Sequence, residues 1–298
     1  MYDVLVIGGG TAGLTAAIYV LRAGKSVMVL ENETFGGQIT SSPKIENFPG
    51  FKSISGTDFA DSLKEQALSL GAGTDFCRAD KIIDNGSYKK VITEYGEYDA
   101  KSVIIATGSK HRHLGVKGEE ELSGMGVSYC AVCDGAFFKE KVCCVIGGGN
   151  AALQSVMHLS SYCSKVYLVH RRDAFRGEER LKDLLSKKEN VEFVLNSVVE
   201  EIKGTQEVES IIIKDVKTDE IKEIKTDGVF IAIGQVPDNS AFSDIVALDG
   251  EGYIIAGEDC KTSCEGIFAA GDCRTKSIRQ LTTASADGSV AGLAACTE

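Results

Sequence analysis

Two cysteines at redox spacing offer the most specific chemistry in this chain. Cys130 and Cys133 form a C-x-x-C pair, a spacing that lets two thiols close a small, reducible disulfide ring. The competing interpretation is half of a zinc site, which needs two further ligands at matching spacing. The chain has no second C-x-x-C, and its four histidines show no ligand pattern. Cys260 and Cys264 form only a C-x₃-C, on an expected surface loop. We therefore predict a redox dithiol and no metal site.

A carboxylic acid follows this pair directly. Asp134 comes after Cys133, and a thiolate that enters or leaves a disulfide needs a proton partner, which a buried aspartic acid can supply. The alternative is an aspartate that caps a turn, and the sequence leaves both open. The remaining cysteines of the ten are expected to be reduced thiols. Among them, Cys143 and Cys144 alternate along an apolar strand as packing residues.

A glycine-rich turn near the start of the chain predicts a dinucleotide site. Its G-x-G-x-x-G motif consists of Gly8, Gly10 and Gly13. The motif lies between an apolar strand (3–7) and a helix (14–23), where glycines allow a tight turn and a close approach of pyrophosphate to the helix N-terminus. Glu31 follows the next strand (26–30), where an acid binds the adenosine ribose. The pattern does not distinguish FAD from NAD, and a glycine-rich surface turn is its alternative.

A second motif of this kind carries the opposite charge. Gly147, Gly149 and Ala152 form G-x-G-x-x-A between a strand (142–146) and a helix (153–162). After the next strand (165–169) the acid is replaced by basic residues, which are His170, Arg171, Arg172 and Arg176. Guanidinium groups bind phosphate through paired, charge-assisted hydrogen bonds. We interpret this cluster as selection for the 2′-phosphate of NADPH. The alternative is a solvated basic turn.

Composition narrows the class of protein. The chain has 298 residues, 43% hydrophobic, with a net charge of −11. This acidic balance argues against nucleic acid as a partner. No apolar run approaches the roughly 20 residues that a membrane span needs. The start, Met1-Tyr2-Asp3, leads into an apolar strand without a basic region, so we expect no signal peptide and a cytoplasmic location.

The two glycine motifs require two βαβ units, about 140 residues apart when Gly8 is compared with Gly147. Two further strands end in turns: 102–106 before Thr107-Gly108, and 266–270 before Gly271-Asp272. A last helix is expected at 282–295. We predict an α/β fold of two Rossmann-like dinucleotide-binding domains, the second inserted into the first. The domains are 1–112 with 238–298, and 113–237.

Together these segments resemble the low-molecular-weight, NADPH-dependent thioredoxin reductases, which are class II pyridine nucleotide-disulfide oxidoreductases. The resemblance covers essentially the whole chain. It rests on GGGTAGLTAAIY (8–19), GGQ (36–38), ENFPG (46–50), ATGS (106–109), CAVCDG (130–135), HRRDAFR (170–176), AIG (232–234), FAAGD (268–272) and RQ (279–280).

The resemblance implies FAD in the first domain and NADPH in the second. The residues expected at FAD are Gly8, Gly10, Thr11, Ala12, Gly13, Glu31, Gly36, Gly37, Gln38, Asn47, Thr107, Gly108, Gly271, Asp272, Arg279, Gln280 and Leu281. Those expected at NADPH are Gly148, Gly149, Asn150, Ala151, Ala152, His170, Arg171, Arg172 and Arg176, and Gly234 is expected beside a cofactor as well. Asp134 is the implied proton donor, thioredoxin the implied partner, and a cytoplasmic homodimer the implied assembly.

The implied mechanism passes electrons from NADPH to FAD, then to the Cys130–Cys133 disulfide, then to thioredoxin, with one domain rotating on two short linkers. Thr11 replaces a proline that is common in the first turn. Gln154 and Ser155 replace two acidic residues that are common in the family, and this puts the handling of the nicotinamide or the contact between domains in question. Three alternatives stay open: a ferredoxin-dependent thioredoxin reductase, an oxidase of small dithiols with the same fold, and a flavin-binding redox sensor without turnover.

Overall fold

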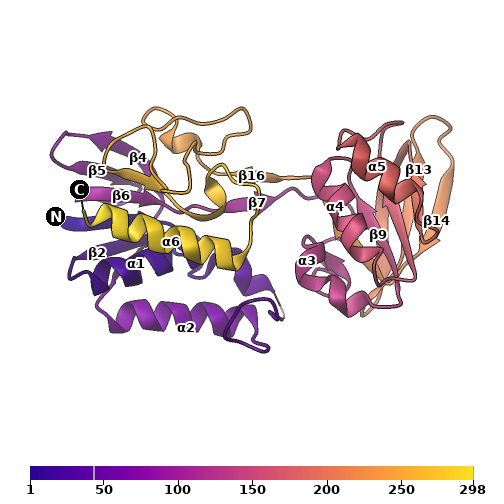
Figure 1. The fold of residues 1–298 in the computed structure, drawn as a ribbon, viewed down its shortest axis with the longest axis horizontal. Helices are drawn as coiled ribbons and strands as arrows, with labels where there is room; N and C mark the ends of the chain where they lie inside the picture. The colour runs from indigo at the N-terminus through magenta and orange to yellow at the C-terminus, as the bar shows by residue number, and fades with distance from the viewer. Residues whose placement is uncertain (43, 298) are drawn as a thin grey trace. The chain divides into compact units, whose positions relative to one another are not determined.

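A computed structural model describes residues 1–42 and 44–297. The chain forms two compact units (Figure 1), one built from residues 1–110 together with the segment from Val236 onward, the other from His111–Gln235. The borders expected from the sequence, after 112 and after 237, each lie two residues from these positions. No described helix is long and apolar enough to cross a membrane.

The first unit is organised around a mixed sheet in the order β3-β2-β1-β6-β5-β4, with β17 paired to β6. Its strands are β1 (Tyr2–Ile7), β2 (Val27–Glu31), β3 (Gly73–Phe76), β4 (Ala79–Asp84), β5 (Lys89–Thr93), β6 (Gly96–Ile105) and β17 (Ile267–Ala269). The strands β1, β2, β3, β6 and β17 run parallel, whereas β4 and β5 form an antiparallel hairpin beside β6. The parallel centre is buried on both faces: Val4 and Val6 face one core, and Leu5 and Ile7 the other.

Three helices of this unit lie on one side of its sheet: α1 (Thr11–Arg22), α2 (Gly56–Ser69) and α6 (Leu281–Ala295) (Figure 1). The helices α1 and α6 approach closely because small residues meet at their crossing. A Cβ at Gly288 would lie 2.3 Å from the carbonyl oxygen of Ala12, and one at Gly292 would lie 2.8 Å from that of Ala16. The C-terminal helix therefore packs directly on the helix that follows the first glycine motif.

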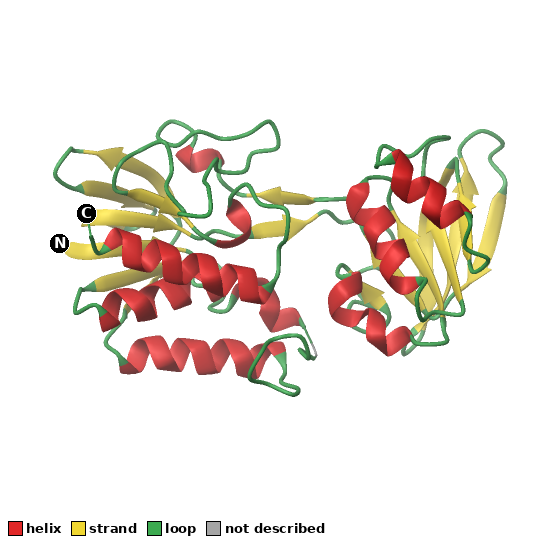
Figure 2. Ribbon diagram, in the orientation of Figure 1, coloured by secondary structure: helices red, strands yellow, loops and turns green. Residues whose placement is uncertain are grey.

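The second unit has a parallel sheet in the order β11-β10-β9-β15-β8. Its strands are β8 (Val127–Ser128), β9 (Val142–Ile146), β10 (Lys165–Val169), β11 (Val191–Val194) and β15 (Gly228–Ile231). The helices α3 (Ala131–Asp134), α4 (Asn150–Leu159) and α5 (Glu179–Ser186) lie on one face (Figure 2), and an antiparallel sheet of β12 (Ser197–Gly204), β13 (Val208–Asp215) and β14 (Ile221–Lys225) covers the other. Cys143 and Cys144, fully buried on opposite faces of the central strand β9, are packing residues as predicted.

The two chain segments that connect the units pair with each other as a two-stranded sheet, β7 (Ser109–His111) and β16 (Gln235–Pro237). Short 3₁₀ turns complete the description: η1 (Gly37–Ser41), η2 (Gly135–Phe138), η3 (Ser240–Phe242) and η4 (Gly271–Cys273).

Both motif helices begin three residues earlier than the sequence predicts, at Thr11 and Asn150 instead of Leu14 and Leu153. In each, the middle glycine of the motif is the N-cap, Gly10 in α1 and Gly149 in α4, with extended backbone. The helices therefore start inside the glycine motifs, which brings their free N–H groups to the loop itself.

Candidate active site

A disulfide joins Cys130 to Cys133 across one turn of chain. Cys130 is the N-cap of α3, and its sulfur accepts a hydrogen bond from the backbone N–H of Cys133 at 3.2 Å. Both residues are partly exposed. The sulfurs are bonded to each other instead of standing free as zinc ligands, which supports the redox interpretation of this spacing. Within residues 1–42 and 44–297, no group of three or more His, Cys, Asp or Glu side chains could hold a metal ion.

Asp134, the last residue of α3, lies partly buried beside this disulfide. Its Oδ2 accepts a hydrogen bond of 2.6 Å from the hydroxyl of Ser128. Burial raises the pKa of the Asp134 carboxyl, although the bond from Ser128 opposes the shift. The same hydroxyl accepts the backbone N–H of Cys130 at 3.0 Å. Ser128 therefore links the acid to the redox pair, a contact that the sequence analysis missed; its signal is a hydroxyl two residues before Cys130.

Most of the remaining cysteines are buried away from the disulfide. Eight are free thiols, six of them buried. Burial raises the pKa of Cys144 and of Cys260 to about 12, and that of Cys273 to about 11. The expectation that Cys260 lies on a surface loop is wrong, because its side chain is fully buried in the core beneath α6, with Sγ donating to the carbonyl oxygen of Asp287 at 3.5 Å.

The first glycine motif has the geometry of a pyrophosphate cradle. Gly8 has φ +108°, and a Cβ there would lie 2.3 Å from the carbonyl oxygen of Ala106. A Cβ at Gly13 would lie 1.9 Å from the carbonyl oxygen of Gly8, so helix and strand meet at van der Waals contact. At Gly10, by contrast, the nearest atom to such a Cβ is 3.7 Å away. The outer two glycines close the turn, and the middle one leaves space for a ligand.

Glu31 ends β2 where the sequence predicts an acid. It is buried, and its Oε2 accepts the backbone N–H of Gly9 at 2.7 Å, while Oε1 accepts that of Glu33 at 2.8 Å. The carboxylate is thereby fixed at the mouth of the glycine loop. Gly36 pairs with Gly10 in a parallel β-bridge. Its φ is +102°, and a Cβ there would lie 2.4 Å from the Cβ of Ala60, so the position does not accept a side chain.

The turn η4 places an unsatisfied acid in the same unit. Oδ1 of Asp272 is buried and has no hydrogen-bond partner among the described residues. Burial raises the pKa of this carboxyl. Arg279 packs its guanidinium 4.1 Å from the ring centre of Tyr253 and donates from Nε to the carbonyl oxygen of Asp272 at 3.3 Å. An orphaned buried acceptor needs a donor from elsewhere, and a polyhydroxyl chain such as the ribitol of a flavin can supply it.

The other residues expected at this cofactor lie in the same unit. Asn47 donates to the side chain of Gln280 at 3.2 Å, and Gln280 in turn caps α6, which begins at Leu281. Thr107 donates to Asn239 at 2.9 Å. Gln38 stands in η1. The residues at 36–38, 107–108 and 271–281, together with Asn47, therefore lie in the same unit as the first glycine loop.

The second glycine motif repeats the cradle. Gly147 has φ +155°, and a Cβ there would lie 2.3 Å from the carbonyl oxygen of Ala232 and 2.8 Å from the Cβ of Ala152. No atom lies within 4 Å of such a Cβ at Gly149. The closed first position and open middle position match those of the first motif.

The arginine loop is attached to this motif by two hydrogen bonds. The N–H of Arg176 donates to the carbonyl oxygen of Gly148 at 2.7 Å, and the N–H of Glu178 donates to the side chain of Asn150 at 2.7 Å. Arg171, Arg172 and Arg176 are exposed. Within the described part of the chain no ion pair engages them. Three cations beside a glycine cradle thus remain available to an anion.

His170 differs from its three basic neighbours. It is buried beneath Gly148, where a Cβ would lie 2.1 Å from its ring, and its Nε2 lies 3.2 Å from the carbonyl oxygen of Ala174. Burial lowers the pKa of this imidazole. His170 therefore supports the loop from below, while the arginines face outward. Gly234, with φ +107°, lies near Arg112 in the connecting region.

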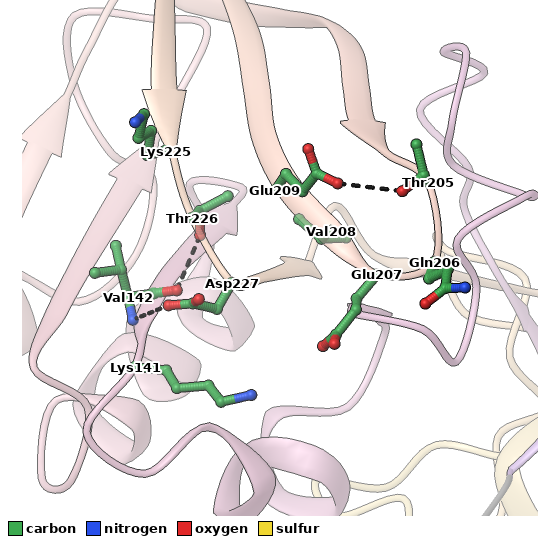
Figure 3. A pocket seen from close by; sticks show the side chains of 10 residues that line it. All are labelled: Lys141, Val142, Thr205, Gln206, Glu207, Val208, Glu209, Lys225, Thr226 and Asp227. Carbon is green, nitrogen blue, oxygen red and sulfur yellow. Dashed lines mark hydrogen bonds between the residues drawn. The ribbon is translucent and has the colours of Figure 1, made fainter.

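A wide cavity of about 720 Å³ in the second unit lies away from these residues (Figure 3). It is lined by the start of β9, the turn between β12 and β13, and the end of β14 with the residues that follow it. Asp227 accepts the N–H of Val142 there at 2.8 Å. The glycine motif follows the carboxyl end of β9, whereas this cavity lies at its amino end, so it is not part of the cradle.

Comparisons with known proteins agree with this geometry. The family model described as pyridine nucleotide-disulphide oxidoreductase matches residues 2–288. A thioredoxin reductase of Listeria innocua is 45% identical over 98% of this chain and 92% of that protein. The structure of thioredoxin reductase from Streptococcus pyogenes is 43% identical with a TM-score of 0.95, covering 99% of this chain and 97% of that one. A ferredoxin-flavin thioredoxin reductase from Clostridium acetobutylicum is 31% identical with a TM-score of 0.54, covering 99% and 97%.

The family match spans both glycine cradles and the disulfide, and the identity extends over nearly the full length of the relatives. The chain belongs to the pyridine nucleotide-disulphide oxidoreductase family and, within it, to the low-molecular-weight thioredoxin reductases.

Proposed function

We propose that this chain is an NADPH-dependent thioredoxin-disulfide reductase that uses FAD. The overall reaction is NADPH, a proton and oxidised thioredoxin giving NADP⁺ and thioredoxin dithiol. The observation that carries the proposal is the accessible Cys130–Cys133 disulfide with Asp134 beside it, in a chain that also holds two nucleotide cradles. The names of the relatives point to the same reaction.

The first unit fits FAD. Gly10 leaves room for pyrophosphate, and Glu31 is fixed beside the loop for ribose hydroxyls. Asp272 has a buried oxygen to which none of the described residues donates. Bound there, FAD supplies a two-electron carrier between a hydride donor and a disulfide. The protein's part is to hold the cofactor in one orientation and to supply charge and hydrogen bonds around it.

The second unit fits NADPH better than NADH. Gly149 is open to a pyrophosphate, and the exposed guanidinium groups of Arg171, Arg172 and Arg176 form no ion pair with any residue that the structure describes. A 2′-phosphate would satisfy them through charge-assisted hydrogen bonds. Gln154 is exposed on α4, and Ser155 turns its hydroxyl back to the carbonyl oxygen of Ala151 at 2.8 Å. Neither places a negative charge near the phosphate.

Cys130 and Cys133 carry out the exchange with thioredoxin. One thiolate of the reduced pair attacks the thioredoxin disulfide and forms a mixed disulfide. The second cysteine of the pair then attacks the mixed disulfide, which restores the Cys130–Cys133 bond, breaks the bond to thioredoxin and releases reduced thioredoxin. The leaving thioredoxin thiolate takes up a proton, and Asp134 is placed to hold one because burial favours its neutral form. Ser128 keeps that acid beside the pair.

The proposal includes three features carried by the family resemblance. These are rotation of one unit on the connecting strands β7 and β16, a homodimer, and a cytoplasmic location. Each is independent of the chemistry of the disulfide. Crosslinking of pairs of introduced cysteines tests the rotation, sedimentation tests the homodimer, and cell fractionation tests the location.

The decisive experiment is an anaerobic titration of the purified protein. We expect NADPH to bleach the flavin absorbance at lower concentration than NADH, and oxidised thioredoxin to restore it. Protein that holds flavin but turns over small dithiols with oxygen instead of thioredoxin would indicate an oxidase. Protein that holds flavin and ignores both nucleotides and thioredoxin would indicate a sensor.

The second candidate is a ferredoxin-dependent reductase. It is favoured by the similarity to the Clostridium acetobutylicum protein and by the loss of two acidic residues at Gln154 and Ser155. The intact second cradle and the three exposed arginines beside it argue against it. Bleaching of the flavin by reduced ferredoxin, with no response to NADPH, would decide for this candidate.

A further inference from the structure

A buried charge cluster lies behind the turn that carries Asp272. Asp287, on α6, is only 5% exposed and accepts hydrogen bonds from three sources. Arg274 donates to both carboxylate oxygens, from Nε to Oδ2 at 2.9 Å and from Nη2 to Oδ1 at 2.8 Å. Lys276 donates to Oδ2 at 2.8 Å, and the backbone N–H of Gly271 donates to the same oxygen at 2.9 Å. The carboxylate thus bonds directly to the residue that precedes Asp272.

The three charged side chains of this cluster are almost completely buried. Arg274 is 1% exposed, and the side chains of Lys276 and Asp287 are 5% and 6% exposed. Burying charges is costly, and apolar replacements of buried ion pairs are often neutral or stabilising. Among the described residues, the buried carboxylate of Asp287 faces two cations, Arg274 and Lys276, and the exposed Glu258 lies 3.4 Å from Arg274. A cluster with this cost fits a role in fixing the position of a neighbour.

The neighbours of Asp287 meet the first nucleotide cradle. The next residue on α6, Gly288, would place a Cβ 2.3 Å from the carbonyl oxygen of Ala12, in the first turn of α1. Gly271 would place one 2.8 Å from the Cβ of Ala12. The helix α6, the turn η4 and the start of α1 therefore converge at Ala12, and Asp287 supplies the polar bond that holds η4 against α6.

We propose that Asp287, held by Arg274 and Lys276, is a positioning residue for the flavin: it fixes the distance between the pyrophosphate cradle of α1 and the acid Asp272. The inference rests on the proposed flavin site and adds to it a residue whose carboxylate is bonded to Arg274, Lys276 and Gly271. Arg274 also accepts, through its carbonyl oxygen, a hydrogen bond of 3.3 Å from Arg279. The same cluster therefore supports the arginine that packs beside Asp272.

The test is flavin release from the holoenzyme, followed by the rise of flavin fluorescence on dilution. Asp287→Asn keeps the shape of the side chain but leaves Arg274 and Lys276 without a carboxylate. We expect release to become about tenfold faster or more, the scale seen when partners that orient ligand-holding groups are removed. Asp84→Asn is the matched control. It removes the carboxylate 2.6 Å from Lys89, whose side chain is also 5% exposed, in the β4–β5 hairpin of the same unit.

Thermal unfolding of both variants separates positioning from general stability. The proposal expects both to unfold at lower temperature, and only Asp287→Asn to release flavin faster. Wild-type release from Asp287→Asn would overturn it, and so would equal acceleration in the control. If Asp287→Asn does not fold, Lys276→Gln replaces it, with faster release expected and unchanged release contradicting the role. Wild-type protein without flavin would instead refute the cofactor site on which the inference rests.

Discussion

Replacing Gly149 with alanine separates the folding role of the second glycine loop from its nucleotide role. The backbone of Gly149 has φ −98° and ψ −176°, which alanine adopts freely, and no atom lies within 4 Å of the added Cβ. As an N-cap, glycine is preferred to alanine, whereas the lower entropy of the unfolded chain favours alanine by about 0.4–1 kcal/mol. These effects oppose each other, so we expect the free energy of unfolding to change by less than about 1 kcal/mol.

Nucleotide binding should respond quite differently. The added methyl group would occupy the space through which pyrophosphate reaches the loop, and overpacking by one carbon costs about 1–3 kcal/mol. That cost corresponds to roughly 5- to 150-fold weaker binding. The assay is the anaerobic titration with NADPH, with the dissociation constant of NADP⁺ as a check that needs no electron transfer.

Two further glycines serve as controls. Gly147→Ala should lower stability by about 1–3 kcal/mol, because its Cβ would lie 2.3 Å from a carbonyl oxygen. Gly250→Ala, also without an atom within 4 Å of the new Cβ, should change neither property. If Gly149→Ala bound NADPH as tightly as the wild type, the open position would not be the approach route of pyrophosphate, and the interpretation of the second cradle would be wrong.

Three other variants test the remaining site residues. The double variant Arg171→Ala with Arg172→Ala should weaken the binding of NADPH by about tenfold or more and leave the binding of NADH unaffected, since a hydrogen bond to a charged group contributes about 1.5–3 kcal/mol. Equal weakening of both nucleotides in steady-state assays would contradict the 2′-phosphate role. Cys133→Ser should abolish thioredoxin reduction and leave bleaching of the flavin by NADPH intact, and loss of both would contradict the assigned order. Asp134→Asn should slow thioredoxin turnover by about a hundredfold. Because burial raises the folded-state pKa of Asp134, its ionisation costs stability as pH rises. Asp134→Asn should therefore flatten this loss when urea unfolding is followed upward from about pH 4, the ordinary pKa of an aspartate, and an unchanged pH dependence would contradict the raised pKa.

The parts of the site that follow from local sequence patterns could be predicted from the sequence. The strands at 142–146 and 165–169 are those observed, and Glu31 ends its strand within reach of the glycine loop. These features follow because a βαβ unit places the strand ends at one edge of the sheet. Glycine positions likewise carry their own information, since a φ near +100° or a close backbone contact strongly favours glycine.

Features that depend on tertiary packing could not be predicted from these local patterns. His170 follows Val169 and was grouped with the arginines, but it turns beneath Gly148 while Arg171 faces solvent. Cys260 has the polar neighbours of a loop, yet α6 covers it. Asp287 lies in a helix of small residues, and its cationic partners come from a different segment at 274–276. Each of these depends on which distant element covers the residue, which no local pattern records.

The burial of the thiols has a consequence for electron flow. At neutral pH a thiol with a pKa near 12 is almost entirely protonated, and protonated sulfur is a poor nucleophile. Cys144, Cys260 and Cys273 therefore cannot intercept a mixed disulfide at Cys130 or Cys133. These three sulfurs, although they belong to the same chain as the redox couple, are therefore kept out of disulfide exchange by their acidity and burial before any partner arrives.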